Sequence, residues 1–350
     1  MKRIQLHAYA KINLTLDVTG KRPNGYHDVE MIMQQISLCD EVTVSWEAGS
    51  VRRGKPGQTA EPDPTGIQIQ LTVSRPDLPA DSSNLAWKAA EEMIAEFGGP
   101  AGGNAKTAAG TEAAGGVLTI DIQKQIPMAA GLAGGSSNCA AVLHAINQLW
   151  ELNLSVKELC RIGARLGSDV PFCIMGQAAA EEALQESFAD DPDACHCALA
   201  TGTGTDLDSF IVLSKPAIGV STAEVYRGID NEGIPRHPDN NAVISAIFEN
   251  NYKVLEEKMV NVLENFALKR YPIIVYTKNI MSDLCQSAGI PNCVMMSGSG
   301  PTVFCLCEEL SKAQQICEVM KSRNPESFVA KTTGQDRHRD VTREGKHVEF

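Results

Sequence analysis

The sequence has no long hydrophobic run, few aromatic residues and no excess of positive charge. No stretch approaches the roughly 18 apolar residues that a membrane-spanning helix needs, and residues 1–6 lack the apolar core of a signal peptide. Lysine and arginine number 31 against 43 aspartate and glutamate residues, which gives a net charge of −12. This balance argues against nucleic acid and anionic membranes as partners, although local lysines can still attract a small anion. We therefore expect a cytoplasmic protein.

Cysteine pairs with the spacing of metal ligands are also missing. The chain has 11 cysteines, an odd number, and no CxxC or HxxxH pattern accompanies Cys195-His196-Cys197. A closed zinc site needs four ligands at workable spacings, so we expect no metal there. Cys305 and Cys307 alternate along one expected strand, which places both thiols on one face. Buried, reduced thiols that pack as small hydrophobic groups account best for this cysteine content.

The chain is long enough for about two domains, at 350 residues with 43% apolar and 21% charged content. Strand and helix patterns alternate along it, which indicates a mixed α/β (α+β) protein. The expected strands are 4–18 (one strand or a pair of strands), 29–37, 41–46, 67–73, 117–122, 210–213, 294–296 and 303–307. The expected helices are 85–97, 139–150, 155–166, 241–267 and 310–321. The Gly/Ala/Thr-rich residues 98–116 and the acidic residues 181–208 are interpreted as insertions.

The most informative segment is residues 126–138, with the sequence Ile-Pro-Met-Ala-Ala-Gly-Leu-Ala-Gly-Gly-Ser-Ser-Asn. An expected strand leads into it and an expected helix leads out. Small residues let a ligand approach the backbone, and the free N–H groups at a helix N-terminus bind phosphate. Either Ser136 or Ser137 could cap the helix. The segment is not a P-loop, because no Lys-Ser/Thr follows the glycines, and a tight turn without a ligand is the alternative.

Together with three further motifs, this segment resembles the GHMP kinases, named for galactokinase, homoserine kinase, mevalonate kinase and phosphomevalonate kinase. Residues 127–137, hereafter the Gly loop, are similar to the phosphate-binding loop of that family. The other motifs are Ala-Lys-Ile-Asn-Leu (10–14) with Gly-Tyr-His (25–27), Gly-Ser-Asp-Val-Pro-Phe (167–172) and Met-Ser-Gly-Ser-Gly-Pro-Thr (296–302). The resemblance runs from Ala8 to about Gly334 and narrows to the branch that phosphorylates a cytidylyl methylerythritol.

The resemblance implies a two-domain fold with the active site in the cleft between the domains. Residues 1–176 would form a domain like the second domain of ribosomal protein S5, residues 177–335 a ferredoxin-like domain, and residues 336–350 a disordered tail. The implied reaction transfers the γ-phosphoryl group of ATP, with Mg²⁺, to the tertiary 2-hydroxyl of the cytidylyl substrate, a step of non-mevalonate isoprenoid synthesis. The implied partners are therefore small molecules, without nucleic acid or membrane, and we expect a monomer or weak homodimer.

Lys11 and Asp169 match the catalytic pair of the family. On its own, an aspartate between serine and proline most often bonds its own backbone in a turn, and a lysine within a strand most often points to solvent. The resemblance instead implies that Asp169 is the general base that takes the proton of the substrate hydroxyl. It places Lys11 beside Asp169, where the ammonium would keep the carboxylate ionised and stabilise the incoming oxygen.

The resemblance also implies two sets of binding residues, and it assigns no residue to the metal with certainty. ATP would contact the Gly loop and two flanking positions, namely Pro127, Met128, Ala129, Ala130, Gly131, Leu132, Ala133, Gly134, Gly135, Ser136, Ser137, Asn84 and Lys124. The substrate would contact Asn13, Tyr26, His27, Thr222 and Tyr226. The two tyrosines would enclose the cytosine ring, although Tyr226 taken alone fits the core face of a helix better.

Two other functions stay open on the sequence. Another small-alcohol GHMP kinase, such as a homoserine kinase, fits the Gly loop but leaves Tyr26-His27 and Tyr226 without a role. A nucleotide-binding regulatory protein that has lost catalysis would not need Lys11 and Asp169. An assay of ATP consumption with and without an acceptor separates the second alternative from an active kinase.

Overall fold

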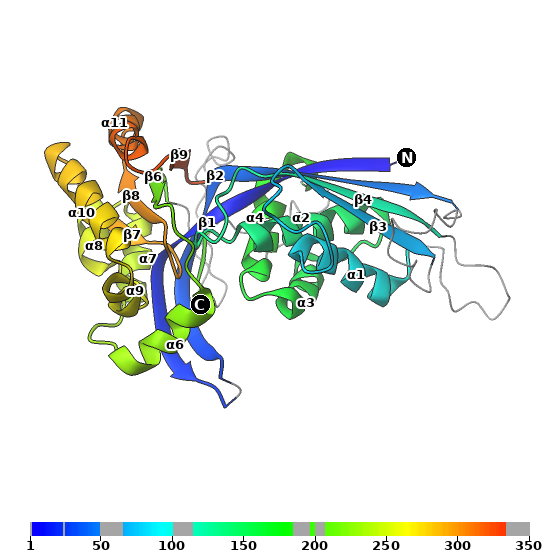
Figure 1. The fold of residues 1–350 in the computed structure, drawn as a ribbon, viewed down its shortest axis with the longest axis horizontal. Helices are drawn as coiled ribbons and strands as arrows, with labels where there is room; N and C mark the ends of the chain where they lie inside the picture. The colour runs from blue at the N-terminus through cyan, green and yellow to red at the C-terminus, as the bar shows by residue number, and fades with distance from the viewer. Residues whose placement is uncertain are drawn as a thin grey trace, which may run out of the picture.

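The computed structural model describes residues 2–23, 25–49, 66–100, 115–184, 197–199 and 207–333. These residues form two sheets, each packed against its own helices (Figure 1). The predicted insertions at 98–116 and 181–208 lie largely outside the described residues, and the predicted tail at 336–350 lies wholly outside them. No helix in the described part of the chain is long and apolar enough to cross a membrane.

The first sheet has the strand order β1-β2-β4-β3, with β5 paired to β2 outside this path. Its strands are β1 (Lys2–Lys21), β2 (His27–Ala48), β3 (Ile67–Val73), β4 (Gly116–Gln123) and β5 (Cys197–Leu199). Neighbouring strands are antiparallel except β3, which runs parallel to β4. Helices cover one face of the sheet (Figure 1), namely α1 (Leu85–Phe97), α2 (Gly134–Leu149), α3 (Val156–Leu166) and α4 (Val170–Ala180), which the 3₁₀ turn η1 (Glu182–Leu184) follows.

The second sheet is antiparallel, with the order β7-β8-β6-β9. Its strands are β6 (Phe210–Lys215), β7 (Val294–Met296), β8 (Val303–Cys307) and β9 (Glu326–Lys331), and it packs against α10 (Pro272–Ser287) and α11 (Leu310–Lys321). The chain order β6-α10-β7-β8-α11-β9 is the ferredoxin-like βαββαβ arrangement. Four helices lie between β6 and α10 in the sequence: α6 (Thr222–Glu232), α7 (Asn240–Phe248), α8 (Tyr252–Lys258) and α9 (Glu264–Arg270).

Most expected elements are confirmed where the local sequence signals agree. The helices expected at 85–97 and 310–321 have those bounds. Ser155 caps α3 in a capping box with Glu158, because each side chain bonds the other residue's backbone N–H. In β8, Cys305 and Cys307 point to one face, with their Sγ atoms 3.9 Å apart.

Two expectations about element length were wrong. The segments expected at 29–37 and 41–46 form the single strand β2, because β1 pairs with it almost continuously from end to end. The helix expected at 241–267 is divided into α7, α8 and α9. The break before α8 comes from Asn250, which has a left-handed φ of 50°, and from Asn251, whose side chain caps the new helix.

Helices α4, α6 and α10 are additional to the expected ones. Helices α4 and α10 each begin beside a proline, Pro171 in α4 and Pro272 in α10. Proline suits the first turn of a helix, since the N–H that it lacks has no partner there. Segment 167–172 therefore contains the start of a helix.

The hairpin β1–β2 is long enough to reach the helices of the second half of the chain. The backbone N–H of Leu16 donates to Val260 O, and Val262 N–H donates to Leu16 O, both at 2.9 Å. Leu16 and Met31 belong to one apolar core with residues of α6, α10, β7 and β8. The part of this hairpin near Leu16 and Met31 therefore lies where the two halves of the molecule meet.

Candidate active site

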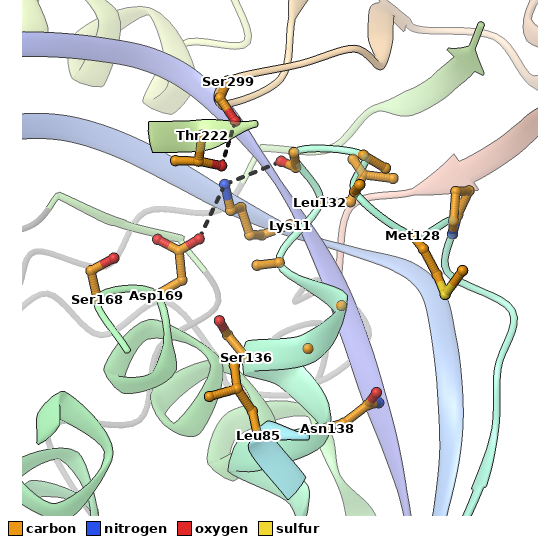
Figure 2. A pocket seen from close by; sticks show the side chains of 18 of the residues that line it. Lys11, Leu85, Met128, Leu132, Ser136, Asn138, Ser168, Asp169, Thr222 and Ser299 are labelled. Atoms are coloured by element: carbon orange, nitrogen blue, oxygen red, sulfur yellow. Dashed lines mark hydrogen bonds and ion pairs between the residues drawn. The ribbon is translucent and has the colours of Figure 1, made fainter. Parts of the chain in front are cut away.

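A cavity of about 480 Å³ lies beside the middle of β1, a size typical of small-molecule sites. Its walls include β1, the Gly loop and the N-terminal ends of α1, α2, α4 and α6, and the turn 297–300 closes it (Figure 2). Four helix N-termini thus face one cavity, which favours an anionic ligand. The turn 297–300, part of the motif at 296–302, contributes Gly298 and Ser299 to the wall.

The predicted catalytic pair lies together in this cavity (Figure 2). Lys11 Nζ is 3.6 Å from Asp169 Oδ2, although the Lys11 side chain is only 5% exposed. The ammonium also donates to Asn13 Oδ1 at 2.7 Å and to Gly131 O at 3.3 Å, so its position is fixed from three directions. Asn13 in turn donates to Met31 Sδ at 3.2 Å, and both residues line the cavity.

Asp169 occupies the N-cap position of α4, but its side chain makes no capping hydrogen bond. Its carboxylate is 28% exposed and reaches into the cavity towards Lys11 (Figure 2). The alternative reading of Asp169 as a turn residue bonded to its own backbone therefore does not fit. A charge-paired carboxylate that still faces an open cavity can accept a proton from a bound hydroxyl.

The Gly loop takes a path that small residues permit. Gly131 has φ 74°, and a Cβ built on it would lie 2.1 Å from Ser297 O, so glycine is required there. Ala129 and Ala133 also have positive φ, 46° and 56°. Ser297 Oγ donates to Gly131 O at 2.9 Å, which fastens the loop to the turn 297–300.

Neither expected serine caps α2, and that expectation was wrong. The helix begins at Gly134, and its N-cap residue Ala133 makes no side-chain hydrogen bond. The serines lie inside the first turn because the two glycines already adopt helical geometry. The first-turn N–H groups therefore have no side-chain cap at the N-cap position and face the cavity, where an anion can bind them.

The two serines have different environments. Ser136 lines the cavity. Ser137 is fully buried, and its Oγ donates to Tyr9 O at 2.6 Å while Gln177 Nε2 donates to Ser137 O at 2.9 Å. Of the two hydroxyls, the one on Ser136 is thus the one directed at the candidate nucleotide site.

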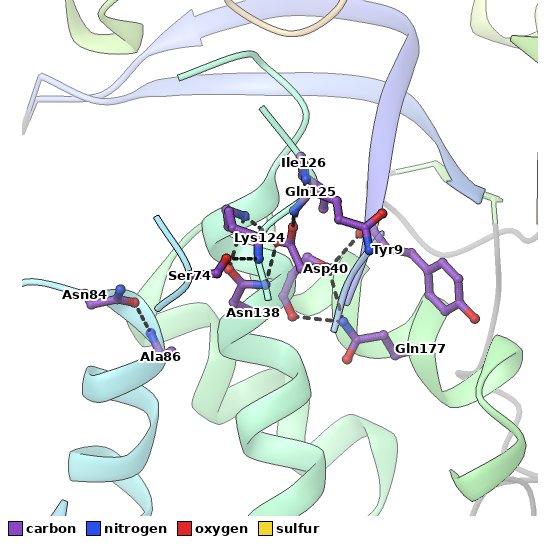
Figure 3. A network of polar contacts seen from close by, with 11 residues as sticks. Tyr9, Asp40, Ser74, Asn84, Ala86, Lys124, Gln125, Ile126, Asn138 and Gln177 are labelled. Carbon is purple, nitrogen blue, oxygen red and sulfur yellow. Dashed lines mark hydrogen bonds and ion pairs between the residues drawn. The ribbon is translucent and has the colours of Figure 1, made fainter. Parts of the chain in front are cut away.

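The two flanking residues predicted for ATP are both on the cavity wall. Asn84 Oδ1 accepts from Ala86 N at 3.0 Å and caps α1 (Figure 3). Lys124 Nζ pairs with the Asp40 carboxylate and donates to Asn138 Oδ1 at 3.2 Å. Burial lowers the pKa of Lys124, and the charge of Asp40 opposes that change.

Of the residues predicted to bind the cytidylyl substrate, some line the cavity and others lie outside it. Thr222 and Tyr226 line the cavity with Asn13, and the Thr222 and Ser299 hydroxyl oxygens are 2.9 Å apart. Burial raises the pKa of Tyr226, and the charge of Asp169 adds to this effect. Thr222 and Tyr226 reach the cavity because they occupy the first turns of α6.

His27 and Tyr26 lie farther out. The His27 ring lies 5.4 Å from the Tyr226 ring, tilted by 34°, and its Nε2 is 2.7 Å from Asp230 Oδ1. Tyr26 is 73% exposed and is not among the residues that line the cavity. The enclosure of a cytosine ring by Tyr26 and Tyr226 stays a prediction.

Sequence reasoning missed several residues of this region. Asp40 and Asn138 fix Lys124, and Ser168 lies on the cavity wall beside Asp169. A carboxylate at the end of an apolar strand segment was the available signal for Asp40, because buried charges need partners. Leu78 and Pro79 belong to a connection with no pattern of its own, so nothing indicated their place on the wall.

Comparison with known families agrees with this geometry. The model of the GHMP kinases N terminal domain matches residues 84–177, and that of the GHMP kinases C terminal region matches residues 243–326. The first match contains the Gly loop and Asp169. The chain belongs to the GHMP kinase family.

Two similar proteins of nearly the same length share the name of one kinase. The 4-diphosphocytidyl-2-C-methyl-D-erythritol kinase of Exiguobacterium sibiricum is 36% identical over 95% of this chain and 99% of its own length. The kinase of that name from Alkaliphilus metalliredigens is 39% identical over 91% of this chain and 92% of its own.

Solved structures show the same fold. The crystal structure of a 4-(cytidine 5'-diphospho)-2C-methyl-D-erythritol kinase, 26% identical, has a TM-score of 0.66 over 95% of this chain and all of that one. Homoserine kinase from Cytophaga hutchinsonii has a TM-score of 0.58 at 16% identity, over 95% of each chain, which shows a shared fold alone. The expected GHMP kinase fold class is confirmed.

Proposed function

We propose that this protein transfers the γ-phosphoryl group of ATP to the 2-hydroxyl of 4-diphosphocytidyl-2-C-methyl-D-erythritol, a step of isoprenoid precursor synthesis. The observation that carries the proposal is the Lys11–Asp169 pair, 3.6 Å apart in a cavity that the Gly loop also lines. The name shared by relatives 36–39% identical over nearly the whole chain supports the choice of substrate.

The nucleotide half of the site is formed by the Gly loop and the start of α2. The first-turn N–H groups of α2 carry the positive end of the helix dipole, so they suit the phosphates of ATP. Gly134 and Gly135 leave the backbone accessible there. Phosphoryl transfer depends mainly on such positioning and charge stabilisation, because the transferred group reacts with little covalent help from protein.

The acceptor half of the site is formed by Lys11 and Asp169. As the substrate oxygen bonds to the γ-phosphorus, the bond from that phosphorus to the bridging oxygen breaks and ADP leaves. The hydroxyl proton passes to the Asp169 carboxylate, which faces the cavity. The Lys11 ammonium stabilises the negative charge that develops on the attacking oxygen, and Asn13 holds that ammonium in place.

The donor set of the cavity fits Mg²⁺, which prefers oxygen ligands and binds through few protein groups plus substrate phosphates. The Ser136 hydroxyl and the Asp169 carboxylate supply oxygens on the wall. When bound, the ion would neutralise charge on the phosphates of ATP. Ser136 lies at the N-terminus of α2, so it is the residue we assign to hold the ion beside the nucleotide.

An acceptor panel tests the proposal. The purified protein is given ATP, Mg²⁺ and either the cytidylyl methylerythritol, homoserine or mevalonate, and ADP release is followed together with product formation by phosphorus NMR. We expect turnover with the cytidylyl substrate and a new phosphomonoester signal from its 2-position. Faster turnover of homoserine would indicate a different kinase, and no acceptor-dependent ADP release would indicate a nucleotide-binding protein without catalysis.

A further inference from the structure

Asp40, near the middle of β2, has a fully buried carboxylate that collects four donors. Oδ1 accepts from the backbone N–H groups of Gln125 and Ile126 at 2.7 and 2.8 Å. Oδ2 accepts from Asn138 Nδ2 at 2.8 Å and pairs with the Lys124 ammonium (Figure 3). Burying a carboxylate is costly unless it is paired and hydrogen-bonded, and here both oxygens are satisfied.

These donors have one thing in common, since all of them adjoin the nucleotide half of the cavity. Gln125 and Ile126 directly precede Pro127, where the Gly loop begins. Lys124 and Asn138 line the cavity, whereas Asp40 is not among its lining residues. Asp40 can therefore influence a bound nucleotide only through the groups that it holds.

The Lys124 ammonium lies directly beneath the first turn of α2. A Cβ built on Gly134 would come within 2.8 Å of Lys124 Nζ. The Lys124 side chain is almost fully buried, so its position depends on its partners Asp40 and Asn138. Without the Asp40 charge, an ammonium buried this deeply would be unpaired and would leave this position.

We propose that Asp40 is a positioning residue for nucleotide binding, which holds Lys124 and the start of the Gly loop in register with the N-terminus of α2. This inference rests on the proposed function, because it takes ATP as the ligand of the Gly loop. It assigns Asp40 to the affinity for ATP and leaves the transfer step to Lys11 and Asp169. No such role was indicated by the sequence motifs.

The first test is Asp40→Asn, which keeps the size of the side chain and removes its charge. The amide oxygen can still accept from the backbone, but its NH₂ group faces the donors Lys124 and Asn138. We expect the Kd for ATP by calorimetry and the KM for ATP to rise roughly tenfold or more, the effect of losing hydrogen bonds to a charged group. We expect kcat to stay within about threefold of wild type, and KM for the acceptor to be unchanged.

A double-mutant cycle tests whether Asp40 acts through Lys124. Lys124→Met should weaken ATP binding, and Asp40→Asn combined with Lys124→Met should weaken it little further, because residues that act as one unit are not additive. A combined loss equal to the product of the two single losses would overturn this part of the proposal. Glu326→Gln is the matched control, since it breaks the Lys215–Glu326 ion pair of 2.7 Å, whose residues do not line the cavity.

Asn138→Ala keeps the test decisive if Asp40→Asn does not fold. It removes one donor from Asp40 and one acceptor from Lys124, and we expect a smaller rise in the Kd for ATP with unchanged kcat. Unchanged ATP affinity in folded Asp40→Asn or in Asn138→Ala would overturn the proposal, as would equal losses in kcat and both KM values. Because ATP affinity is measured without acceptor, a failure of the cytidylyl substrate in the assay leaves this result standing, whereas wild-type protein that binds no ATP refutes both.

Discussion

Lys11 is an almost fully buried lysine whose ammonium touches two neutral oxygens and one carboxylate. The neutral partners, Asn13 and Gly131, fix its position, and Asp169 supplies the opposite charge. A buried cation is stable only with such compensation. The pair is therefore arranged to present a carboxylate and a positive charge to the same point of the cavity.

Removing the charge of Asp169 should affect the transfer step and leave binding intact. For Asp169→Asn we expect kcat to fall by ~10²–10⁴-fold, the usual effect of losing a general base. The Kd values of ATP and acceptor should change little, because the amide keeps the size of the side chain and its oxygen, and Asn13 and Gly131 still hold Lys11. Steady-state kinetics and calorimetry on the same preparation measure both. A fall of less than tenfold would make Asp169 a structural residue of α4.

Lys11→Ala should act on the same step as Asp169→Asn. Because the two groups serve one proton transfer and one developing charge, their losses should not multiply. The double variant is therefore expected to be about as slow as the slower single variant. Multiplicative losses in kcat would show that the two residues act independently.

Motifs identified these reacting residues, but their supports were not predictable. Lys11 and Asp169 lie within short segments whose spacing is specific to the family. Asp40 belongs to no motif. Its role depends on a contact between β2 and the residues just before the Gly loop, since Asp40 Oδ1 accepts from the Gln125 and Ile126 N–H groups at 2.7 and 2.8 Å. Local sequence carries no signal for such a contact between segments 85 residues apart.

Among the secondary-structure elements, α2 combines the nucleotide site with the core of the first domain. Its first turn faces the cavity, and the rest of its length is almost wholly buried between the sheet and α1, α3 and α4. Elements with strict patterns, such as β3 and α1, have the bounds that their sequences indicate. The start of α2 was placed too late, because glycines rarely signal a helix start and the anion-binding turn requires them.

Gly135 offers the sharpest test of the anion-binding turn. A Cβ at Gly134 would meet Lys124 Nζ at 2.8 Å and Ile126 at 3.0 Å, but the nearest atom to a Cβ at Gly135 is Leu85 Cδ1 at 3.6 Å. Gly135→Val should therefore keep the fold and weaken ATP binding by roughly tenfold or more, since its side chain covers the free N–H groups.

Gly135→Ala is the matched variant for this test. It should weaken ATP binding less than valine does, while the Tm of the protein without ligand stays constant or rises, because alanine favours a helix over glycine. Calorimetry and thermal unfolding check the two effects separately. ATP affinity that is unchanged in the valine variant would mean that the phosphates do not bind at this turn.

His144, in the middle of α2, should make stability depend on pH. It is fully buried, with its Nε2 3.0 Å from Ile174 O, and burial lowers its pKa from 6.5 to about 4. Between these values the unfolded chain binds the proton and the folded protein does not. The contribution of His144 to the free energy of unfolding is thus fully present above pH 6.5 and decreases as the pH falls. At pH 5 the decrease is about 2 kcal/mol.

His144→Gln removes this titration and keeps a donor for Ile174 O. Chemical denaturation at pH 7.5 and pH 5 should show that wild type loses about 2 kcal/mol more than the variant over this interval. Equal losses in the two proteins would mean that other groups produce the pH dependence. Nucleotide affinity at pH 7.5 should be the same in both, because His144 does not line the cavity.

Across the whole molecule, the long hairpin β1–β2 runs from the first sheet to the second half of the chain (Figure 1), and the cavity lies beside the middle of β1. Lys11 comes from its middle, while Thr222 and Tyr226 come from α6 of the second half. The family resemblance predicted two domains with a site between them. It did not predict the path of one strand pair through both halves, because hydrophobic alternation reports which face is buried but not which partner covers it.

The substrate proposal makes its sharpest prediction at this scale, because both halves of the chain must close around one ligand. If Tyr226 stacks on the cytosine, Tyr226→Ala should weaken binding of the cytidylyl substrate by roughly 1–3 kcal/mol, the scale of stacking between a base and an aromatic ring. ATP affinity should be nearly unchanged. Tyr26→Ala should behave in the same way if Tyr26, exposed in this structure, folds over the other face of the base.

Methylerythritol phosphate, which lacks the cytidine, should then be a poor acceptor for the wild-type protein. In the wild type, kcat/KM for methylerythritol phosphate should be lower than kcat/KM for the cytidylyl substrate. In Tyr226→Ala this difference should largely disappear, since the variant can no longer stack on the base. Measuring kcat/KM for both acceptors with both proteins gives the comparison directly. Equal values for the two acceptors in wild type would show that the base is not recognised, and the protein would then be a GHMP kinase for another alcohol.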